Sequence, residues 1–198
     1  MTKMDYEFKD LYLNTVPLFN VFPETVAFVV GRFQPFHNGH KALIEEALKI
    51  SEHVVVFIGS VQESRTDKNP YTYEERKAMI TTTFHNKVTV IPLKDYTSHN
   101  MWIEKIKQKL AVLGYHKSKQ IFVCCNKDEE TLESNKLLSE FETHPVVQPN
   151  VLNATDIRHK LFKENIDPLT LTDVPVQTKL ILSYLDLTVK PAKFKYNI

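Results

Sequence analysis

The sequence predicts an α/β protein, with a Rossmann-like, doubly wound parallel sheet of about five strands and a helical C-terminus. Short runs of continuous apolar residues, typical of strands buried on both faces, alternate with segments that repeat apolar residues at helical spacing. This alternation is typical of right-handed βαβ units, in which all strands end at the same edge of the sheet. We therefore expect the ligand site in the loops that follow the strands, after Val30, Ile58, Leu93, Cys125 and Gln148.

Five strands are expected from runs of β-branched and aromatic residues. The first two, at 26–30 and 54–58, are wholly apolar, and each is followed directly by a glycine. The third, at 88–93, and the fourth, at 121–125, have the same apolar character, while the fifth rests on two adjacent valines at 146–147.

Helices are expected between and after these strands. Thr72 and Glu75 have the spacing of a capping box that opens the second helix, Gly114 ends the third, and Asn153 is suited to cap the fifth. Apolar residues three and four apart mark the buried face of each helix. The expected helices cover residues 43–50, 72–84, 102–113, 129–141, 154–162 and 175–187.

Composition narrows the class of protein. We expect residues 1–25 to be an N-terminal extension and residues 26–198 to be one domain. The 25 basic and 24 acidic side chains give a net charge of +1, so nucleic acid and membrane surfaces are not expected partners. No signal peptide and no apolar run of roughly 20 residues are visible, and the two cysteines, Cys124 and Cys125, are adjacent. We expect a cytoplasmic protein with two buried, reduced thiols that point to opposite faces of their strand.

Only four glycines occur in the chain, which excludes the common glycine-rich nucleotide loops. Neither the GxxxxGK[ST] phosphate loop, the GxGxxG dinucleotide fingerprint, the kinase glycine loop nor a Nudix-type box fits their positions. A nucleotide-binding protein with this sequence needs another way to hold phosphate.

The loop after the first strand reads GRFQPFHNGH and offers such a way. His37 and His40 are three positions apart at the start of a helix and share a face, with Gly39 between them and the cations Arg32 and Lys41 at either side. Positive charge at a helix N-terminus opposes the helix dipole, whereas a bound anion would make the arrangement favourable. Two alternatives are a zinc site, disfavoured because we expect the cysteines two strands away, and a solvated turn with incidental histidines.

This loop resembles the HxGH signature of the nucleotidyltransferases related to class I aminoacyl-tRNA synthetases. With GRFQPFH ahead of it, it is most similar to the archaeal-type nicotinamide-nucleotide adenylyltransferases and to the adenylyltransferase half of bifunctional adenylyltransferase/Nudix enzymes. The resemblance runs from about Val26 to about Leu187, without the hydrolase half. It implies an HxGH nucleotidyltransferase domain that transfers the adenylyl group of ATP to nicotinamide mononucleotide (NMN), giving NAD and pyrophosphate in NAD biosynthesis. It also implies Mg²⁺ bound mainly through the ATP phosphates, and self-association into a homo-oligomer.

Two further loops match this resemblance at the substrate side. The segment 59–72 parallels the family's GSxxxSRTxxNPFTxxER pattern, where the basic residue before the N-P pair, here Lys68, meets the mononucleotide phosphate together with Arg32. In relatives, the tryptophan at the position of Trp102 stacks on the pyridine ring; ordinary helix packing is the alternative explanation for it. A polar surface loop is the alternative for 59–72. The implied substrate-binding residues are Arg32, Gly59, Ser60, Lys68, Asn69, Asp95, Asn100 and Trp102.

The remaining loops match at the ATP side. The segment Asn153–Arg158 resembles the family's second signature, and Arg158 is a cation at a helix start, as Arg32 and Lys41 are at the first helix. The resemblance assigns these three residues to catalysis: the histidines at the triphosphate, with His40 nearest the α-phosphate, and Arg158 at its β/γ end. A surface ion pair of Arg158 with Asp156 or Glu164 is the alternative. The implied ATP-binding residues are Gly31, Phe33, Gln34, Gly39, Asn126, Lys127, Asp128, Asn153, Thr155, Ile157 and Arg158, and no metal site made of protein ligands is expected.

Other functions remain open from the sequence. Within the same class, the acceptor could be nicotinate mononucleotide, phosphopantetheine or FMN, and the donor could be CTP. In other classes, the chain could be a non-catalytic regulator that binds NAD or ATP, or an RNA-binding relative of the synthetases. The near-zero net charge and the absence of a basic stripe disfavour the RNA-binding alternative.

Overall fold

The computed structural model describes residues 23–125, 135–147 and 152–188. In these residues most of the predicted elements form in the predicted order, with boundaries shifted by a few residues. Short 3-10 turns occur at His85–Lys87, Tyr115–Lys117 and Pro168–Thr170. The elements are β1 (Thr25–Gly31), α2 (Asn38–Ile50), β2 (Val54–Ile58), α3 (Tyr73–Phe84), β3 (Val88–Pro92), α4 (His99–Val112), β4 (Lys119–Cys124), β5 (Glu142–Pro145), α6 (Ala154–Phe162) and α7 (Val176–Thr188).

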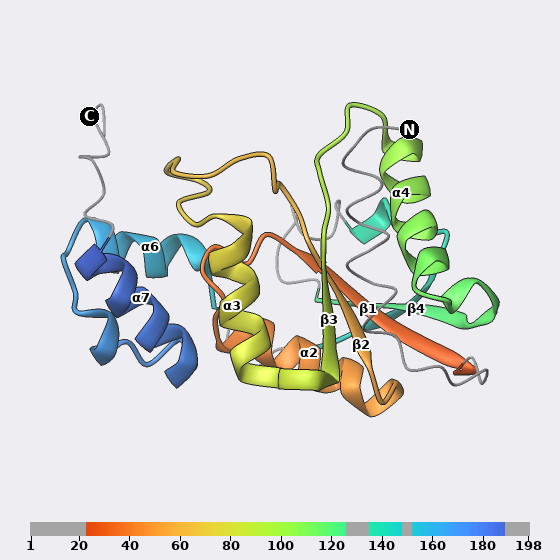
Figure 1. Ribbon diagram of the computed structural model, residues 1–198, viewed down its shortest axis with the longest axis horizontal. Helices are drawn as coiled ribbons and strands as arrows, with labels where there is room; N and C mark the ends of the chain where they lie inside the picture. The colour runs from red at the N-terminus through yellow and green to blue at the C-terminus, as the bar shows by residue number, and fades with distance from the viewer. Residues whose placement is uncertain (1–22, 126–134, 148–151, 189–198) are drawn as a thin grey trace.

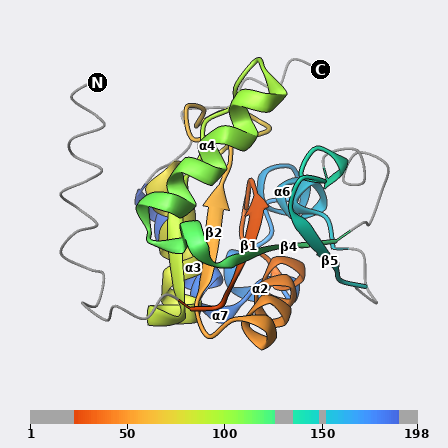
Figure 2. The same ribbon diagram turned by 90° about the vertical axis from the view of Figure 1, so that its right-hand side faces the viewer.

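The five strands form one parallel sheet in the order β3-β2-β1-β4-β5, which confirms the predicted fold class. Figure 2 shows β5 beside β4 at one edge of the sheet. The chain runs outward from β1 through β2 to β3 and then returns to place β4 on the other side of β1. The carboxyl ends of β1 and β4 therefore flank the point where the winding reverses, which is where open α/β sheets bind their ligands.

Helices cover both faces of the sheet, and α3 and α4 lie on opposite sides of the strands (Figure 1). On one face, alternate strand residues such as Val29 and Val56 pack against α2, α3, α6 and α7. On the other, Phe28 and Phe57 pack against α4 and the segment 138–141. Because side chains alternate along a strand, these continuous apolar runs supply both cores.

The predicted helix caps are confirmed. The side chains of Thr72 and Glu75 form a reciprocal capping box at the start of α3. The Asn153 side chain accepts a hydrogen bond from Thr155 N at 2.9 Å at the start of α6. After α4, Gly114 adopts a φ of 91°, the left-handed conformation that glycine allows at a helix end.

Two element predictions were wrong. The fifth strand is Glu142–Pro145 and not the valine pair 146–147, because it is an edge strand whose exposed side chains carry no apolar signal. The helix expected at 129–141 does not extend to its predicted end: residues 137–140 form turns, and 129–134 lie outside the described residues.

The predicted surroundings of the cysteines also need correction. The sheet order places β4 directly beside β1, so Cys124 and Cys125 lie next to the first loop and not two strands away. Cys124 is buried, and burial raises the pKa of its thiol, but Cys125 is partly exposed. Both cysteines are free, as predicted.

Candidate functional site

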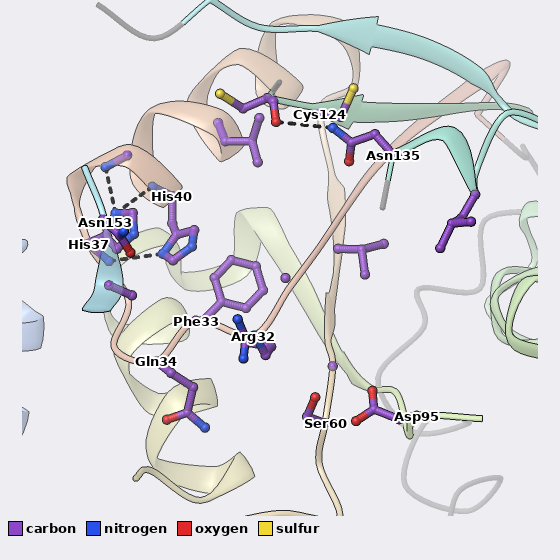
Figure 3. Close-up of a pocket in the computed structure, with 18 of the residues that line it drawn as sticks. Arg32, Phe33, Gln34, His37, His40, Ser60, Asp95, Cys124, Asn135 and Asn153 are labelled. Carbon is purple, nitrogen blue, oxygen red and sulfur yellow. Dashed lines mark hydrogen bonds between the residues drawn. The ribbon is translucent and has the colours of Figure 1, made fainter. Parts of the chain in front are cut away.

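A cleft of about 640 Å³ opens at the carboxyl edge of the sheet, a size suited to small-molecule ligands. The ends of β1 and β4, the loops after β2 and β3, and the first turns of α2, α4 and α6 line it. Figure 3 shows His37, His40 and Asn153 toward one end of the cleft and Ser60 and Asp95 toward the other, with Arg32 and Phe33 between them. The two helix starts that the sequence singled out thus share one cavity.

The two histidines cap the helix on which they lie. Nδ1 of His37 accepts hydrogen bonds from the backbone N–H of Gly39 (3.1 Å) and of His40 (3.3 Å), and Nδ1 of His40 accepts one from His37 N at 3.4 Å. The two rings stack with centroids 3.7 Å apart. In a neutral imidazole whose Nδ1 accepts, the proton sits on Nε2. The cap therefore sets both rings as Nε2–H donors.

Phe33 and Phe36 hold the His40 ring in place. The Phe33 ring meets the His40 ring edge to face, with the ring centroids 4.7 Å apart. The Phe36 ring lies nearly parallel to the His40 ring, with the centroids 6.0 Å apart. Phe33 has a φ of 52°, a conformation that costs an L-residue about 1–3 kcal/mol and that persists only where its surroundings enforce it. The α2 start is therefore preorganised by its own sequence, with no acidic residue in its first turn.

Arg158 links α6 to the first loop. Its Nη1 donates to the carbonyl of Gln34 at 2.8 Å, and its Nη2 donates to Thr155 Oγ1 at 3.1 Å. Arg158 is the fifth residue of α6, so it lies in the second turn rather than the first, and its guanidinium reaches back to the helix start. Glu164, one of the partners considered from the sequence, bonds His159 at 2.9 Å.

Gln34 has a role that sequence reasoning missed. Its side-chain amide donates to Tyr71 O and accepts from Tyr71 N, both at 2.9 Å, while its carbonyl receives Arg158. Gln34 thereby ties the loop after β1 to the loop after β2 and to α6. Both the nitrogen and the oxygen of its side-chain amide are hydrogen-bonded in this way, although the residue lines the cleft.

The other end of the cleft is built from the loops after β2 and β3. The Gln62 side chain donates to Asp95 Oδ2 at 2.8 Å and accepts from Asp95 N at 3.2 Å, which joins the two loops. Arg32 lines the cleft, and its Nη1 is buried without a hydrogen-bond partner among the residues that the structure describes. Trp102, half-buried in the first turn of α4, lines the cleft together with Asp95 and His99.

Arg76 is the second residue that sequence reasoning missed. It is fully buried beneath the loops after β1 and β2, and it donates to the backbone carbonyls of Arg32, Gly59, Ser60 and Thr72. The only signal for it was the E-R pair that follows the capping threonine, of which capping explained the glutamate. Burial lowers the pKa of Arg76 to about 10, so the side chain stays charged at neutral pH.

The predicted site residues fall into three groups. Those that line the cleft are Gly31, Arg32, Phe33, Gln34, His37, Gly39, His40, Gly59, Ser60, Asp95, Trp102, Asn153, Thr155 and Arg158. Asn126, Lys127 and Asp128 lie outside the described residues. The structure does not bring Ile157, Lys68, Asn69 and Asn100 to the cleft wall.

These last four residues have other surroundings. Ile157 is part of the core beneath the cleft. Lys68 is exposed in the loop after β2, where Asn69 is buried and donates to Glu63 Oε2 at 2.6 Å. Asn100 is the second residue of α4.

Among the described residues, no group of three or more His, Cys, Asp or Glu side chains has the arrangement of a metal site. The same part of the chain contains no helix with the length and apolarity that crossing a membrane requires.

Comparison with known proteins identifies the family to which the chain belongs. The profile of the family described as cytidylyltransferase-like matches residues 28–160, which include both helix starts and all of the sheet except the first three residues of β1. The chain belongs to the cytidylyltransferase-like family. A nicotinamide-nucleotide adenylyltransferase from Picrophilus torridus is 38% identical over 85 residues, 41% of this chain. One from Halorubrum lacusprofundi is 28% identical over 154 residues, which cover 74% of this chain and 84% of that relative.

The matches differ in extent. The chain spans about half the length of the Picrophilus relative and of two Thermoplasma relatives. Among solved structures, the chain resembles a bifunctional NMN adenylyltransferase/ADP ribose pyrophosphatase from Francisella tularensis complexed with AMP and a Mn ion. That likeness has a TM-score of 0.67 and 22% identity, and it covers 84% of this chain and 51% of that one. It shows that the two proteins share this fold.

Proposed function

We propose that the chain transfers the adenylyl group of ATP to NMN, giving NAD and pyrophosphate. The observation that carries this proposal is the meeting of two helix starts, with His37 and His40 on one and Arg158 on the other, in one cleft. The names of the Picrophilus and Halorubrum relatives support the same reaction.

In this reaction the substrate is its own nucleophile. An oxygen of the NMN 5′-phosphate attacks the α-phosphorus of ATP in line, and the bond from that phosphorus to the bridging oxygen breaks, so that pyrophosphate leaves with the electron pair. Phosphate monoesters have a second pKa near 6 and are mostly dianionic at neutral pH. No general base and no protein nucleophile are needed, so the protein acts by positioning and by stabilising charge.

His37 and His40 would supply hydrogen bonds to the triphosphate. Their Nδ1 atoms are engaged in the α2 cap, which leaves Nε2–H as the donor on each ring. Since the cap and the Phe33 ring fix the His40 imidazole before ATP binds, little reorganisation is needed as charge builds on the α-phosphate. We assign His40 to the α-phosphate and His37 to the neighbouring phosphates.

Arg158 would hold the β- and γ-phosphates. Its guanidinium already bridges the start of α6 and the loop after β1, so both walls of the cleft position it. A guanidinium carries its N–H donors in a planar fork that suits phosphate oxygens. Asp156, in the first turn of α6, offsets part of the positive charge there.

The opposite end of the cleft would take NMN. The buried Nη1 of Arg32, which has no hydrogen-bond partner in the described part of the chain, suits a phosphate ligand. Trp102 offers an indole face to the cationic pyridine ring, a contact worth about 0.5–2 kcal/mol. Asp95, held by Gln62, offers acceptors for hydroxyl or amide groups. Lys68 and Asn69 lie outside the cleft wall, so their proposed role would require movement of the loop after β2.

Mg²⁺ would enter as the ATP complex, where it neutralises phosphate charge and helps pyrophosphate to leave. The chain's own contribution at that point is the pair of histidines and Arg158, because no carboxylate cluster occurs among the described residues.

The test is incubation with ATP, Mg²⁺ and a panel of mononucleotides, measuring pyrophosphate release and dinucleotide formation by chromatography. We expect NMN to give NAD with equimolar pyrophosphate, at a higher kcat/KM than nicotinate mononucleotide, FMN or phosphopantetheine. Another preferred acceptor, or CTP as the preferred donor, would replace the proposed substrates while keeping the reaction type. Binding of ATP or NAD without any turnover would make the chain a regulator instead.

Two further predictions concern the whole protein. We propose that the protein self-associates into a homo-oligomer. Analytical ultracentrifugation tests this, and a monomer at all concentrations would contradict it. We also propose that the protein is cytoplasmic. Fractionation of cells that express the chain tests this, and recovery outside the cytoplasmic fraction would contradict it.

A further inference from the structure

The strongest unexplained feature outside the assigned residues is the environment of Arg76 in α3. Its side chain is fully buried, yet its hydrogen-bond partners among the described residues are all carbonyl oxygens. Nη1 donates to Arg32 O and to Gly59 O, each at 2.8 Å, and Nη2 lies 3.5 Å from Ser60 O. Asp95 and Glu75 stabilise its charge from a distance, but a buried guanidinium without a hydrogen-bonded carboxylate is still costly, so a purely structural purpose would be served better by an apolar side chain.

The direction of these peptide groups suggests what the guanidinium does. In a trans peptide the N–H points opposite to the C=O. Since Arg76 draws three carbonyls toward itself, the N–H groups of the same peptide units, those of Phe33, Ser60 and Val61, point the other way. Arg32, Phe33, Gly59 and Ser60 line the cleft, whereas Arg76 does not. The N–H groups therefore point away from Arg76, which for Phe33 and Ser60 is toward the cleft that they line; Val61, the next residue, packs its side chain against the core.

Backbone conformation points to the same conclusion. Phe33 and Ser60 have φ values of 52° and 50°, in the left-handed region that non-glycine residues rarely adopt. Successive N–H groups around such residues form concave anion-binding nests. The bonds from Arg76 hold the peptide units on which these conformations depend, and the charge of Arg76 lies directly behind them.

We propose that Arg76 is a positioning residue that turns the backbone N–H groups of Phe33, Ser60 and Val61 toward the cleft, where they bind a phosphate monoester. The inference rests on the proposed function, in which this end of the cleft holds the phosphate of the mononucleotide. Arg76 acts through the backbone and does not touch the ligand. Since it remains charged at neutral pH, it adds a favourable potential to the three N–H dipoles.

The first test uses the wild-type chain and requires no variant to fold. Ribose 5-phosphate, added to ¹⁵N-labelled protein, should shift the backbone amide resonances of Phe33, Ser60 and Val61, and ribose at the same concentration should not. Unchanged resonances at all three positions under saturating ribose 5-phosphate would overturn the proposal.

The second test compares Arg76→Lys, which keeps the charge but loses the fork, with Lys77→Gln, which alters charge on the same helix. For Arg76→Lys we expect KM for NMN to rise about tenfold to a hundredfold, while KM for ATP changes less than about threefold. Lys77→Gln should leave both constants near wild type. A lower melting temperature with both KM values unchanged, or an equal rise in both, would show that Arg76 only stabilises the fold.

A third measurement separates this inference from the proposed reaction. Trp102 is the only tryptophan of the chain and lines the cleft, so its fluorescence reports binding without turnover. We expect ribose 5-phosphate to bind Arg76→Lys about tenfold more weakly than wild type. In Arg76→Ala, added methylguanidinium should restore binding of ribose 5-phosphate, and methylammonium should not. Equal binding of ribose 5-phosphate by wild type and Arg76→Lys would overturn the inference. A wild type that binds the phosphate but makes no NAD would overturn the proposed reaction alone.

Discussion

Replacing His40 with alanine separates catalysis from stability, because the structure gives the ring two distinct tasks. The proposed function uses its Nε2–H as a donor to the triphosphate, while its Nδ1 accepts the 3.4 Å bond from His37 N that completes the α2 cap. Losing one preorganised donor to a developing negative charge costs about 3–4 kcal/mol, or roughly a hundredfold to a thousandfold in kcat. Losing a cap costs about 0.5–2 kcal/mol, and the length of this bond places the cost near the lower value. A chain of this size should then lose only about 2–4 °C in melting temperature.

The assay is kcat for NAD formation at saturating ATP and NMN, together with the melting temperature from circular dichroism. His159→Ala is the matched control: this histidine lies on α6 with 62% of its side chain exposed and bonds Glu164 rather than facing the cleft. We expect its kcat to stay within about twofold of wild type. A His40→Ala variant that keeps wild-type turnover would remove His40 from the reaction, whatever its melting temperature.

Three other perturbations have outcomes that the structure specifies. Arg158→Ala should raise KM for ATP and lower kcat, whereas an effect on melting temperature alone would favour a structural role for its bond to the first loop. Gly31→Ala should lower the melting temperature, because a Cβ there would lie 3.0 Å from the Phe33 ring. Gly59→Ala should not lower it, because the nearest atom to a Cβ there lies 3.8 Å away. A raised KM for NMN in Gly59→Ala would indicate that phosphate approaches the backbone there. Burial lowers the pKa of His53 in the folded chain, so its contribution to stability is complete above the ordinary value of 6.5 and is lost as the pH falls through the lowered pKa. Between about pH 7 and about pH 5, the melting temperature should therefore fall more for wild type than for His53→Gln. An equal fall in melting temperature for the two proteins would contradict this.

Apolar patterning predicted the central part of this fold. The first four strands are buried, so their sequences had to be apolar, and capping side chains such as Thr72 and Asn153 mark helix starts through local hydrogen bonds. The edge strand β5 has only exposed residues, and its position follows from backbone pairing with β4. Hydrophobicity carries no information about such a strand, which is why the valine pair at 146–147 was misleading.

The site was predictable where residue type and helix start coincide, and not where the contacts span distant segments. His37, His40 and Arg158 are visible as phosphate-binding residue types near helix starts, although that pattern did not reveal that the histidines cap their own helix. Arg76 lies 44 positions from Arg32, and Gln34 lies 37 positions from Tyr71. No local pattern encodes these partners, and the strand order that brings the cysteines beside the first loop is equally non-local.

Radiolabelled ATP tests most directly whether the two helix starts hold a triphosphate for attack at its α-phosphorus. With NMN and Mg²⁺ present, label at the α-phosphate should appear in NAD and label at the γ-phosphate in pyrophosphate, and both transfers should be lost together in His40→Ala. Transfer of the γ-label to NMN, or release of the α-label as AMP without NAD, would contradict adenylyl transfer in this cleft.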